Sequence, residues 1–400
     1  MGPAWLRRFV DDPRVVAIGL VAAAVLLSAV TATPGDSTDR TRGSGGASGQ
    51  AALALPSPDP TGVPSDSPPD SSASPAMSPA PLSSTSPSPV PSAVPQPSGR
   101  FPGGLLIADR GNGRLLAVDD AGRILWRFPV AGSLPQGQSF QADDAFVAPD
   151  GKTIMANDEA HQVIDRIDIA TRRVVWQYGH YGRIGSGPGF LHTPDDAYPL
   201  ANGNVVVADI RNCRIMEISP KKATVRQWGR TGRCVHHPPT SYAQPNGDTP
   251  LPDGGLLITE ITGSRIVRLD AAGHVVFDIH APVQYPSDAQ LDARGNVIVV
   301  DYANPGAVLR LSPTGRVLWR YGPRIGLGRL DHPSLAVPLP DGTIVLNDDD
   351  RQRIVVIDPR TNRIVWQYGT TDRASRAAGH LSVPDGIEVV RPGVFVPAVP

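Results

Sequence analysis

The chain has 400 residues and a formal net charge of −1, and glycine (41 residues) and proline (43 residues) are both abundant. Binding to nucleic acid is not expected, because phosphate recognition requires a concentrated basic surface and no basic cluster stands out. Most of the proline lies in one region, so the chain is expected to consist of segments with different physical character.

The N-terminal segment is predicted to anchor the protein in a membrane. Residues 1–14 form a short N-terminus with three arginines, and residues 15–32 contain no charged side chain. This apolar stretch is just long enough to cross a bilayer as a helix, and the preceding arginines favour a cytoplasmic N-terminus. A cleavable signal peptide is the alternative, because the small residues at 30–32 match the pattern that a signal peptidase accepts. The prediction is therefore a single-pass protein of the cell membrane with the rest of the chain outside the cytoplasm, or else a secreted protein.

Residues 33–100 are predicted to be a linker. They are mostly Pro, Ser, Ala, Gly, Thr and Asp, and they contain no aromatic side chain. Such a segment cannot bury enough apolar surface to offset the entropy lost on ordering it. We expect a disordered Pro/Ser-rich stalk that carries the C-terminal domain.

Residues 101–400 contain an internal repeat, which predicts the fold of this domain. Each unit has a glycine turn, an aliphatic strand that ends near an acid or amide, a polar turn and a second aliphatic strand. A third strand with a large aromatic residue follows, as in RVVWQYG, and a short segment precedes each glycine. The six units begin at Gly103, Gly151, Gly203, Gly254, Gly295 and Gly342. Six repeats of four short strands predict an all-β, six-bladed β-propeller.

The two ends of the domain are expected to complete one blade together. The first unit lacks an innermost strand, whereas the C-terminus supplies one that has no complete unit after it. We therefore predict that residues 386–390 pair with residues 105–108, which would close the ring and remove exposed sheet edges. Residues 394–396 are interpreted as a surplus strand that has no place in this scheme.

The hairpins and outer strands resemble two known propeller repeats. Two hairpins resemble NHL repeats, with an acid, an asparagine and an arginine around the middle turn: Asp109, Asn112 and Arg114, then Asp209, Asn212 and Arg214. Three outer strands are similar to the tryptophan-docking pattern of PQQ-type repeats: Asp168, Thr171 and Trp176, then Asp358, Thr361 and Trp366, and Ser312, Gly315 and Trp319. These resemblances imply propeller geometry for residues 101–400. PQQ itself is not expected as a cofactor, because the dehydrogenases that use it typically have eight blades and dedicated cofactor residues.

A large aromatic residue recurs at one position of the outer strand: Trp126, Trp176, Trp228, Phe277, Trp319 and Trp366. A repeated large ring at one strand position is typical of packing between neighbouring sheets, so these residues are interpreted as structural. The acid and the arginine that flank the middle turn are interpreted in the same way, as an ion pair that bridges each hairpin.

The two cysteines of the chain, Cys213 and Cys234, are predicted to form a disulfide. The alternation of strand direction places both on the same face of the ring, and the domain is expected to lie in an oxidising compartment. Two free thiols are the alternative.

Histidines in turns and inter-blade loops gather on that same face and mark a candidate ligand surface: His161, His192, His237, His332 and His380. Peptidyl-hydroxyglycine lyases are NHL-type propellers that bind zinc through histidines just before an inner strand, and His192, His332 and His380 occupy similar positions. This resemblance implies zinc as an alternative metal. The segment PLANGNVVV at Pro199 is similar to repeats of the arylsulfotransferases, which are also propellers.

One polar residue follows the proline, or its equivalent Ala142, that opens each inner strand: Asp143, Asp195, Asn246, Ser287, Ser334 and Asp385. One interpretation is a set of local turns between side chain and backbone. Equivalent positions of a closed propeller converge on the axis, so the other interpretation is a ring of six oxygens at the channel mouth. Its carboxylates, on Asp143, Asp195 and Asp385, would then bind calcium.

The sequence favours a binding module over an enzyme. It has no GxSxG motif and no phosphate-binding glycine loop, and no catalytic residue is assigned. We expect an extracytoplasmic, membrane-tethered propeller that binds a peptide, glycan or small molecule at its loop face. The alternative is a metal-dependent extracytoplasmic enzyme, similar to the lyases or sulfotransferases named above.

Overall fold

The computed structural model of the protein describes residues 99–395. The predicted membrane segment at 15–32 and the predicted linker up to residue 98 lie outside the described residues. Within the described part of the chain, no helix combines the length and the apolar character needed to cross a membrane.

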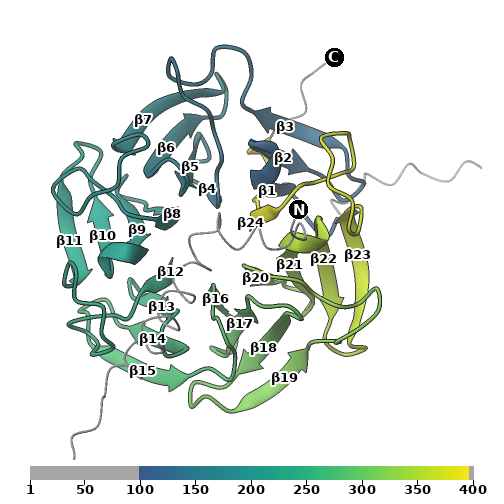
Figure 1. Ribbon diagram of the computed structural model, residues 1–400. Coiled ribbons are helices and arrows are strands. Elements are labelled where there is room, and N and C mark those ends of the chain that lie inside the picture. Colours follow the sequence, from purple (N-terminus) through teal and green to yellow (C-terminus); the bar gives the residue numbers. More distant parts are fainter. Residues whose placement is uncertain (1–98, 396–400) are drawn as a thin grey trace, which may run out of the picture. The chain divides into compact units, whose positions relative to one another are not determined.

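Residues 99–395 form six four-stranded antiparallel sheets around a common axis (Figure 1), which confirms the predicted all-β, six-bladed propeller. In blades 2 to 6 the innermost strand comes first in the chain and the outermost strand last. The strands of blade 2 are β4 (Ala145–Val147), β5 (Thr153–Asp158), β6 (Val163–Asp168) and β7 (Arg173–Gly179), and those of blade 3 are β8 (Pro194–Pro199), β9 (Val205–Asp209), β10 (Arg214–Ile218) and β11 (Thr224–Gly229). Blade 4 contains β12 (Pro245–Pro250), β13 (Leu256–Glu260), β14 (Arg265–Leu269) and β15 (Val275–His280), blade 5 contains β16 (Ala289–Leu291), β17 (Val297–Asp301), β18 (Ala307–Leu311) and β19 (Val317–Tyr321), and blade 6 contains β20 (Ala336–Pro338), β21 (Ile344–Asp348), β22 (Arg353–Asp358) and β23 (Arg363–Gly369).

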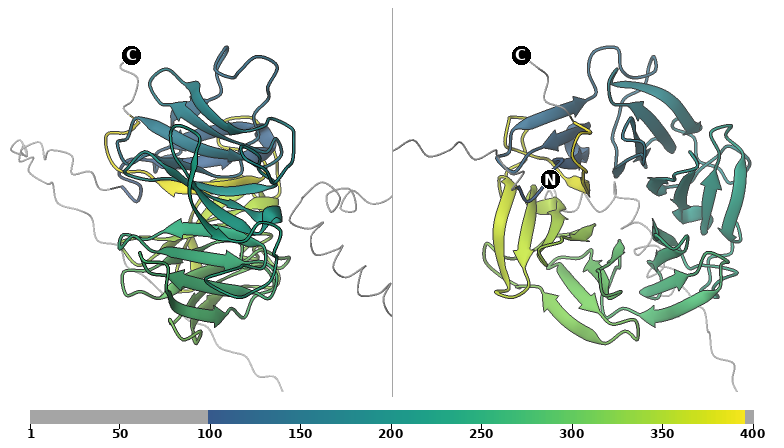
Figure 2. Two further views of the ribbon diagram at one scale, coloured as in Figure 1. Left: turned by 90° about the vertical axis from the view of Figure 1, so that its left-hand side faces the viewer. Right: turned by 180° about the vertical axis from the view of Figure 1, so that it is seen from behind.

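Blade 1 is assembled from both ends of the domain. Its three outer strands are β1 (Leu105–Asp109), β2 (Arg114–Val118) and β3 (Ile124–Phe128), and its innermost strand is the C-terminal β24 (Pro384–Val389), as the two views of Figure 2 also show. Leu105 lies opposite Val389 and Ala108 lies opposite Gly386. The predicted closure of the ring is therefore confirmed.

The hydrophobic core lies between the blades. Every residue of β9 and of β17 is buried, whereas in the outermost strand β7 only Tyr178 is buried and the other residues are exposed or half-buried. The second strand of each blade is covered on both faces by neighbouring blades, which explains why sequences such as VVVAD in β9 and VIVVD in β17 are nearly continuous aliphatic runs rather than alternating ones.

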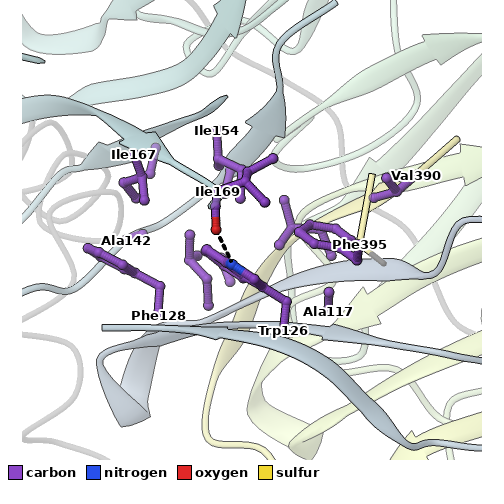
Figure 3. Packing of buried hydrophobic residues seen from close by; sticks show 14 of the residues in the cluster. Ala117, Trp126, Phe128, Ala142, Ile154, Ile167, Ile169, Val390 and Phe395 are labelled. Atoms are coloured by element: carbon purple, nitrogen blue, oxygen red, sulfur yellow. Dashed lines mark hydrogen bonds between the residues drawn. The ribbon is translucent and has the colours of Figure 1, made fainter. Parts of the chain in front are cut away.

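The tryptophans of the outer strands join each blade to the next, as predicted. In four blades the indole Nε1 donates to an acceptor in the following blade: Trp126 to the carbonyl of Ile169 (2.9 Å), Trp176 to that of Pro220 (2.9 Å), Trp319 to Asn362 Oδ1 (3.1 Å) and Trp366 to the carbonyl of Asp120 (3.2 Å). Figure 3 shows the first of these bonds within its buried cluster. The fifth, Trp228, carries the guanidinium of Arg226 over its ring at 4.4 Å.

The interpretation of residues 394–396 as a surplus strand is wrong for the two of them that are described. Residues 391–395 form turns, because Pro392 offers no backbone N–H and Gly393 has a φ of 89°. Phe395 packs against Trp126 instead, with 5.5 Å between the ring centroids, and is buried (Figure 3).

The middle turns of blades 1, 3 and 6 are short 3₁₀ helices, η1 (Arg110–Asn112), η2 (Ile210–Asn212) and η3 (Asp349–Arg351). The predicted acid–arginine bridge forms across these three turns: Asp109–Arg114 (2.5 Å), Asp209–Arg214 (2.7 Å) and Asp348–Arg353 (2.7 Å). In blade 4 the prediction is wrong, because Arg265 pairs with Asp278 on the outermost strand (2.6 Å). The bridge is therefore not a feature of every hairpin.

Candidate functional site

The six polar residues predicted at the channel mouth lie at the start of the inner strands, and none is more than 2% exposed: Asp143, Asp195, Asn246, Ser287, Ser334 and Asp385. Hydrogen bonds connect neighbouring positions. The side chain of Asn246 donates to Asp195 (2.6 Å), and Ser334 Oγ donates to the backbone carbonyl of Asp385. The structure thus places these six residues at equivalent buried positions, some of them joined by hydrogen bonds, and we call this set the polar ring.

Arg110 pairs with two of the carboxylates of the polar ring. This residue opens the turn η1, and its Nη1 lies 2.7 Å from Asp143 and 2.6 Å from Asp385. Its Nη2 lies 3.0 Å from Glu159, which is also buried. Two of the three carboxylates that the sequence offered to calcium therefore have a guanidinium as an ion-pair partner.

A second group of acids lies next to the polar ring along the inner strands. Asp144, Asp196, Asp248 and Asp288 come from blades 2, 3, 4 and 5 in turn, and each is at most 3% exposed. One carboxylate oxygen from each of Asp144, Asp196 and Asp288 lies within 4.8 Å of the other two. We call these four residues the axial carboxylates.

Burial and repulsion between carboxyls raise the pKa values of two axial carboxylates, Asp196 and Asp248. For Asp196 the pKa is raised well above its usual value by burial first and then by the neighbouring carboxyls of Asp288 and Asp144. Burial and the carboxyl of Asp288 have the same effect on the pKa of Asp248. Such a group is expected to hold protons or a cation at neutral pH.

The opposite ends of the inner strands surround a cavity of about 300 Å³ on the axis. All six inner strands contribute to its wall, which is mainly apolar and includes Phe146 and Tyr198, stacked with 3.9 Å between their ring centroids. Its polar groups include Gln290 and Glu388. Burial raises the pKa of Glu388 to about 8, although its carboxylate accepts a hydrogen bond from the Val147 N–H (2.6 Å). At neutral pH the Glu388 carboxyl is therefore mostly protonated, so it adds a polar but uncharged group to this apolar wall.

Two of the predicted loop-face histidines are bound to carboxylates of their own blades. His161 Nδ1 lies 2.8 Å from Asp158 Oδ1. His332 Nδ1 lies 2.8 Å from Asp331 and 3.2 Å from Asp350. Burial lowers the pKa of His332, but the hydrogen bonds to the two carboxylates outweigh this effect and raise the pKa to about 9. His332 is therefore an imidazolium in an ion-pair cluster at neutral pH.

The other three histidines lie apart from these two. Burial and the nearby Arg211 lower the pKa of His192. His237 is exposed in a short turn that pairs with Ser241, and His380 Nδ1 lies 3.2 Å from the carbonyl of Ala378. Within residues 99–395, no group of candidate metal ligands contains two histidines.

The loop between blades 5 and 6, residues 322–333, holds apolar side chains out into the solvent. Ile325 is 84% exposed and Leu327 is 79% exposed. The loop between blades 2 and 3 carries a second RIG sequence with Ile184 61% exposed. Ile325 and Leu327 lie only two residues apart, so their exposed side chains offer neighbouring apolar groups on one loop.

Arg351 holds the backbone of the 322–333 loop in place through hydrogen bonds. Its buried guanidinium donates to the carbonyl oxygens of Gly326 (3.1 Å) and Arg329 (2.8 Å). The same guanidinium pairs with Asp372 (2.9 Å), which belongs to the loop between blades 6 and 1. Arg353 also contacts both loops, through Thr371 Oγ1 (3.1 Å) and the carbonyl of Arg329 (3.0 Å), so two arginines fix the loops to one another.

The predicted disulfide between Cys213 and Cys234 is confirmed, with 5.1 Å between the Cα atoms. It joins the end of η2 to the loop between blades 3 and 4. Cys213 has a φ of 54°, a left-handed conformation that few residues other than glycine adopt without cost. The disulfide fixes this loop on the same face as Ile325.

Residues 160–386 match the family described as "Outer membrane protein assembly factor BamB", whose repeat is of the PQQ type. The match covers more than half of the chain. This chain belongs to the BamB family. The PQQ-type resemblance of the outer strands is thereby confirmed, and the tryptophan bonds between blades are its structural counterpart. No curated protein matches the whole sequence significantly.

Several solved structures are similar to this BamB-family chain at low sequence identity. A protein of unknown function from Bacteroides caccae aligns with a TM-score of 0.50 and 16% identity, over 71% of this chain and 97% of that one. A protein in a nidogen/laminin complex aligns with a TM-score of 0.46 and 15% identity over 71% and 97% of the two chains. Virginiamycin B lyase from Staphylococcus aureus aligns with a TM-score of 0.42 and 15% identity over 68% and 85%. At these identities the likeness concerns the fold alone.

The sequence did not single out the axial carboxylates or Arg110. A signal for three of the acids was present, because Asp144, Asp196 and Asp288 each follow a residue of the polar ring directly. The BamB-family match includes Asp196, Asp248 and Asp288 but begins after Asp144. Arg110 gave no signal, because its partners Asp143, Glu159 and Asp385 are close to it only in the folded ring.

Proposed function

We propose that this protein is a propeller held outside the cytoplasmic membrane by its N-terminal segment, and that its loop face binds a protein partner. The observation that carries the proposal is the pair Ile325 and Leu327, which are exposed on a loop that Arg351 holds in place. The partner that this surface fits is an acidic segment with apolar side chains.

The fixed conformation of the 322–333 loop favours the interpretation that its exposed apolar side chains bind a partner. Apolar side chains on a mobile loop would pay an entropy cost when a partner ordered them, whereas a loop already held by Arg351 avoids most of that cost. Clustered apolar anchors surrounded by polar groups are typical of binding surfaces. Ile325 and Leu327 therefore present a preorganised anchor.

The charge of the loops favours an acidic partner. The six inter-blade loops, residues 129–142, 180–193, 230–243, 281–287, 322–333 and 370–383, contain seven arginines and two aspartates. Of these arginines, Arg324 is exposed beside Ile325, and Arg373 is exposed in the adjacent loop. Arginine binds carboxylates in a bidentate manner, so acidic side chains next to the apolar ones would be recognised.

Three observations support a position outside the cytoplasm. The apolar residues 15–32 are long enough for a membrane helix. The Cys213–Cys234 disulfide is typical of an oxidising compartment. The family description names an assembly factor of the outer membrane, which agrees with a role in the cell envelope.

The binding proposal is tested with the full-length protein and an array of overlapping peptides in which acidic and large apolar side chains are combined. We expect selective binding of such peptides with affinities that fall as salt is raised. Replacing Ile325 and Leu327 together by serine should weaken the best peptide by about tenfold or more, since apolar anchors at interface centres contribute roughly 1–2 kcal/mol each. Arg324→Gln should weaken it further and reduce the salt dependence.

The matched control replaces Val225 and Val276 by serine. These residues are 54% and 51% exposed, but they lie on the outermost strands β11 and β15. Equal losses in both double variants would mean that general surface polarity, not the 322–333 loop, governs binding. Binding of neutral glycans in preference to every acidic peptide would overturn the proposed partner.

The tether is tested separately by deleting residues 15–32. The full-length protein is expected in the membrane fraction after an alkaline wash, and an added protease should reach the propeller from outside. The deletion variant should remain in the cytoplasm. A mature N-terminus near residue 33 would instead identify a secreted protein.

A further inference from the structure

Three of the four axial carboxylates converge on one point near the propeller axis, and the fourth, Asp248 of blade 4, lies near enough to Asp288 for its pKa to be affected. Asp144 and Asp288 directly precede β4 and β16, while Asp196 and Asp248 lie within β8 and β12. Oxygens of Asp144, Asp196 and Asp288 lie within 4.8 Å of one another, although these residues belong to blades 2, 3 and 5. Oxygens about 2.4 Å from a common ion would be separated by no more than about this distance.

Asp248 is a second observation that points to a ligand near Asp288, whose carboxyl raises the pKa of Asp248. Its side chain has no exposed surface, and neither of its carboxylate oxygens accepts a hydrogen bond within residues 99–395. Among the described residues, Asp196 has no hydrogen-bond partner other than the neighbouring carboxyl of Asp288. Burying an ionised carboxylate without a donor is among the most costly arrangements in a protein, so native structures supply a partner.

Two axial carboxylates occupy space that is free only because the neighbouring residues are glycines. A Cβ atom on Gly247 would lie 2.5 Å from Asp288 Oδ1, and one on Gly386 would lie 2.3 Å from Asp144 Oδ1. Real Cβ atoms do not approach oxygens so closely, so any larger residue at either position would displace a carboxylate. Gly386 and Gly247 thus permit the close approach of Asp144 and Asp288 to the inner strands.

The chemistry of the donors determines which ion would fit. All four groups are carboxylates, and neither histidine nor cysteine belongs to the group. An all-oxygen set of this size favours a hard cation with a high coordination number over zinc or copper. Bidentate carboxylates and water can complete the six to eight oxygens that calcium requires.

We propose that Asp144, Asp196, Asp248 and Asp288 bind a calcium ion on the axis of the propeller. This site lies beside the polar ring, where the sequence placed calcium on Asp143, Asp195 and Asp385. Arg110 neutralises Asp143 and Asp385 of the polar ring, whereas Asp144, Asp196 and Asp288 form a further group of close carboxylates, which shares Asp144 with a group of Asp143 and Asp195. The ion would join four blades and would act independently of the 322–333 loop.

The proposal is tested on the full-length protein by thermal unfolding and titration calorimetry with calcium as the probe. In a calcium-loaded buffer the melting temperature should rise by about 5 °C or more above its value in excess chelator, since a ligand at 100 times its Kd gives a shift of this order. Calorimetry should show one calcium per chain. Magnesium should give a smaller shift, because the buried site offers several carboxylates rather than a hydrated octahedral site.

Asp288→Asn gives the discriminating result. It removes a calcium ligand and also a repelling charge, so in chelator this variant should melt at or above the temperature of the wild type. In calcium it should gain no increment and melt below the wild type. The matched control is Asp165→Asn, which neutralises another buried aspartate, on β6, and should keep the full calcium shift.

Three results would overturn the proposal. One is a wild-type melting temperature that is equal in chelator and in calcium, with no heat of binding. Another is an undiminished calcium shift in Asp288→Asn, which would mean that shared protons rather than an ion stabilise the axial carboxylates. The third is a shift with zinc but not with calcium.

Discussion

Arg110 Nη1 lies 2.6 Å from Asp385 Oδ2, although 275 residues separate them in the chain. Arg110 belongs to the first blade's turn and Asp385 to the last strand, so this ion pair lies at the point where the ring closes. The same guanidinium also contacts Asp143 of blade 2. One arginine of the blade 1 turn thus contacts both the closing strand β24 and the segment that precedes the inner strand of blade 2.

Replacing Arg110 by glutamine should destabilise the whole ring. Asp143 and Asp385 would lose their guanidinium partner while remaining buried, and loss of one partner of a buried pair typically costs roughly 3–5 kcal/mol. Chemical denaturation should show this loss. Arg123→Gln is the control, because its pair with Asp119 is at the surface and should contribute less than about 1 kcal/mol. A second change, Asp385→Asn, should restore part of the stability; an Arg110 variant as stable as its Arg123 counterpart would show that strand pairing alone closes the ring.

The Cys213–Cys234 disulfide should stabilise the domain. It closes a loop of 21 residues, for which loop entropy predicts a contribution of about 3 kcal/mol. The double variant Cys213→Ser, Cys234→Ser should therefore unfold at a lower denaturant concentration than the oxidised wild type. Addition of reductant should shift the wild type to the same midpoint and leave the variant unchanged. A wild type whose midpoint is insensitive to reductant would contradict the prediction.

His332 should make the stability of the domain depend on alkaline pH. Its pKa is about 9 in the folded chain, while an unfolded histidine titrates near 6.5. Between these values the folded chain binds more protons, so the free energy of unfolding should be greatest below about pH 6.5 and fall as the pH approaches 9. The effect is expected to be on the order of 2 kcal/mol, because the imidazolium is partly exposed and also shares Asp331 with Arg329. His332→Gln should remove this part of the pH profile, whereas His274→Gln, an exposed histidine, should not.

The repeat determined most of what could be predicted, because blade formation depends on local patterns. Glycine turns, aliphatic strands and the tryptophan in the outer strand recur at similar positions, so alignment of the units revealed six blades and their closure. The axial carboxylates escaped this approach because an acid directly follows the polar-ring residue in only three of the six units, and Asp248 lies one residue further along. Asp196 is two residues after Pro194, whereas Asp248 is three residues after Pro245, and the strand pairing is irregular in both places.

Long-range partners were the other source of error. Arg265 was expected to pair across its own turn, yet Asp278 on the neighbouring strand is the acid that it contacts. Phe395 was expected in a strand, but Trp126 offered an apolar surface for its ring. Neither contact can be predicted from the local sequence pattern, because each depends on which side chains the closed ring brings together.

Glu388 should oppose folding at alkaline pH, and its replacement should therefore stabilise the protein. The pKa of its carboxyl is about 8 in the folded chain because burial disfavours the charge, whereas the unfolded carboxyl titrates near 4.5. Between these values the unfolded chain binds fewer protons, so the free energy of unfolding should fall as the pH rises from about 5 to 8. Glu388→Gln keeps an acceptor for the Val147 N–H and removes the charge, so above pH 8 it should be more stable than the wild type by something on the order of 2 kcal/mol, with little difference near pH 4. Urea titrations at pH 5, 7 and 9 measure this difference directly.

Glu217→Gln is a suitable control, because that residue is half-buried on β10, away from the axial cavity. A Glu388→Gln variant whose advantage stayed constant from pH 5 to 9 would show that the gain arises from packing in the cavity, and that the carboxyl at 388 does not titrate there.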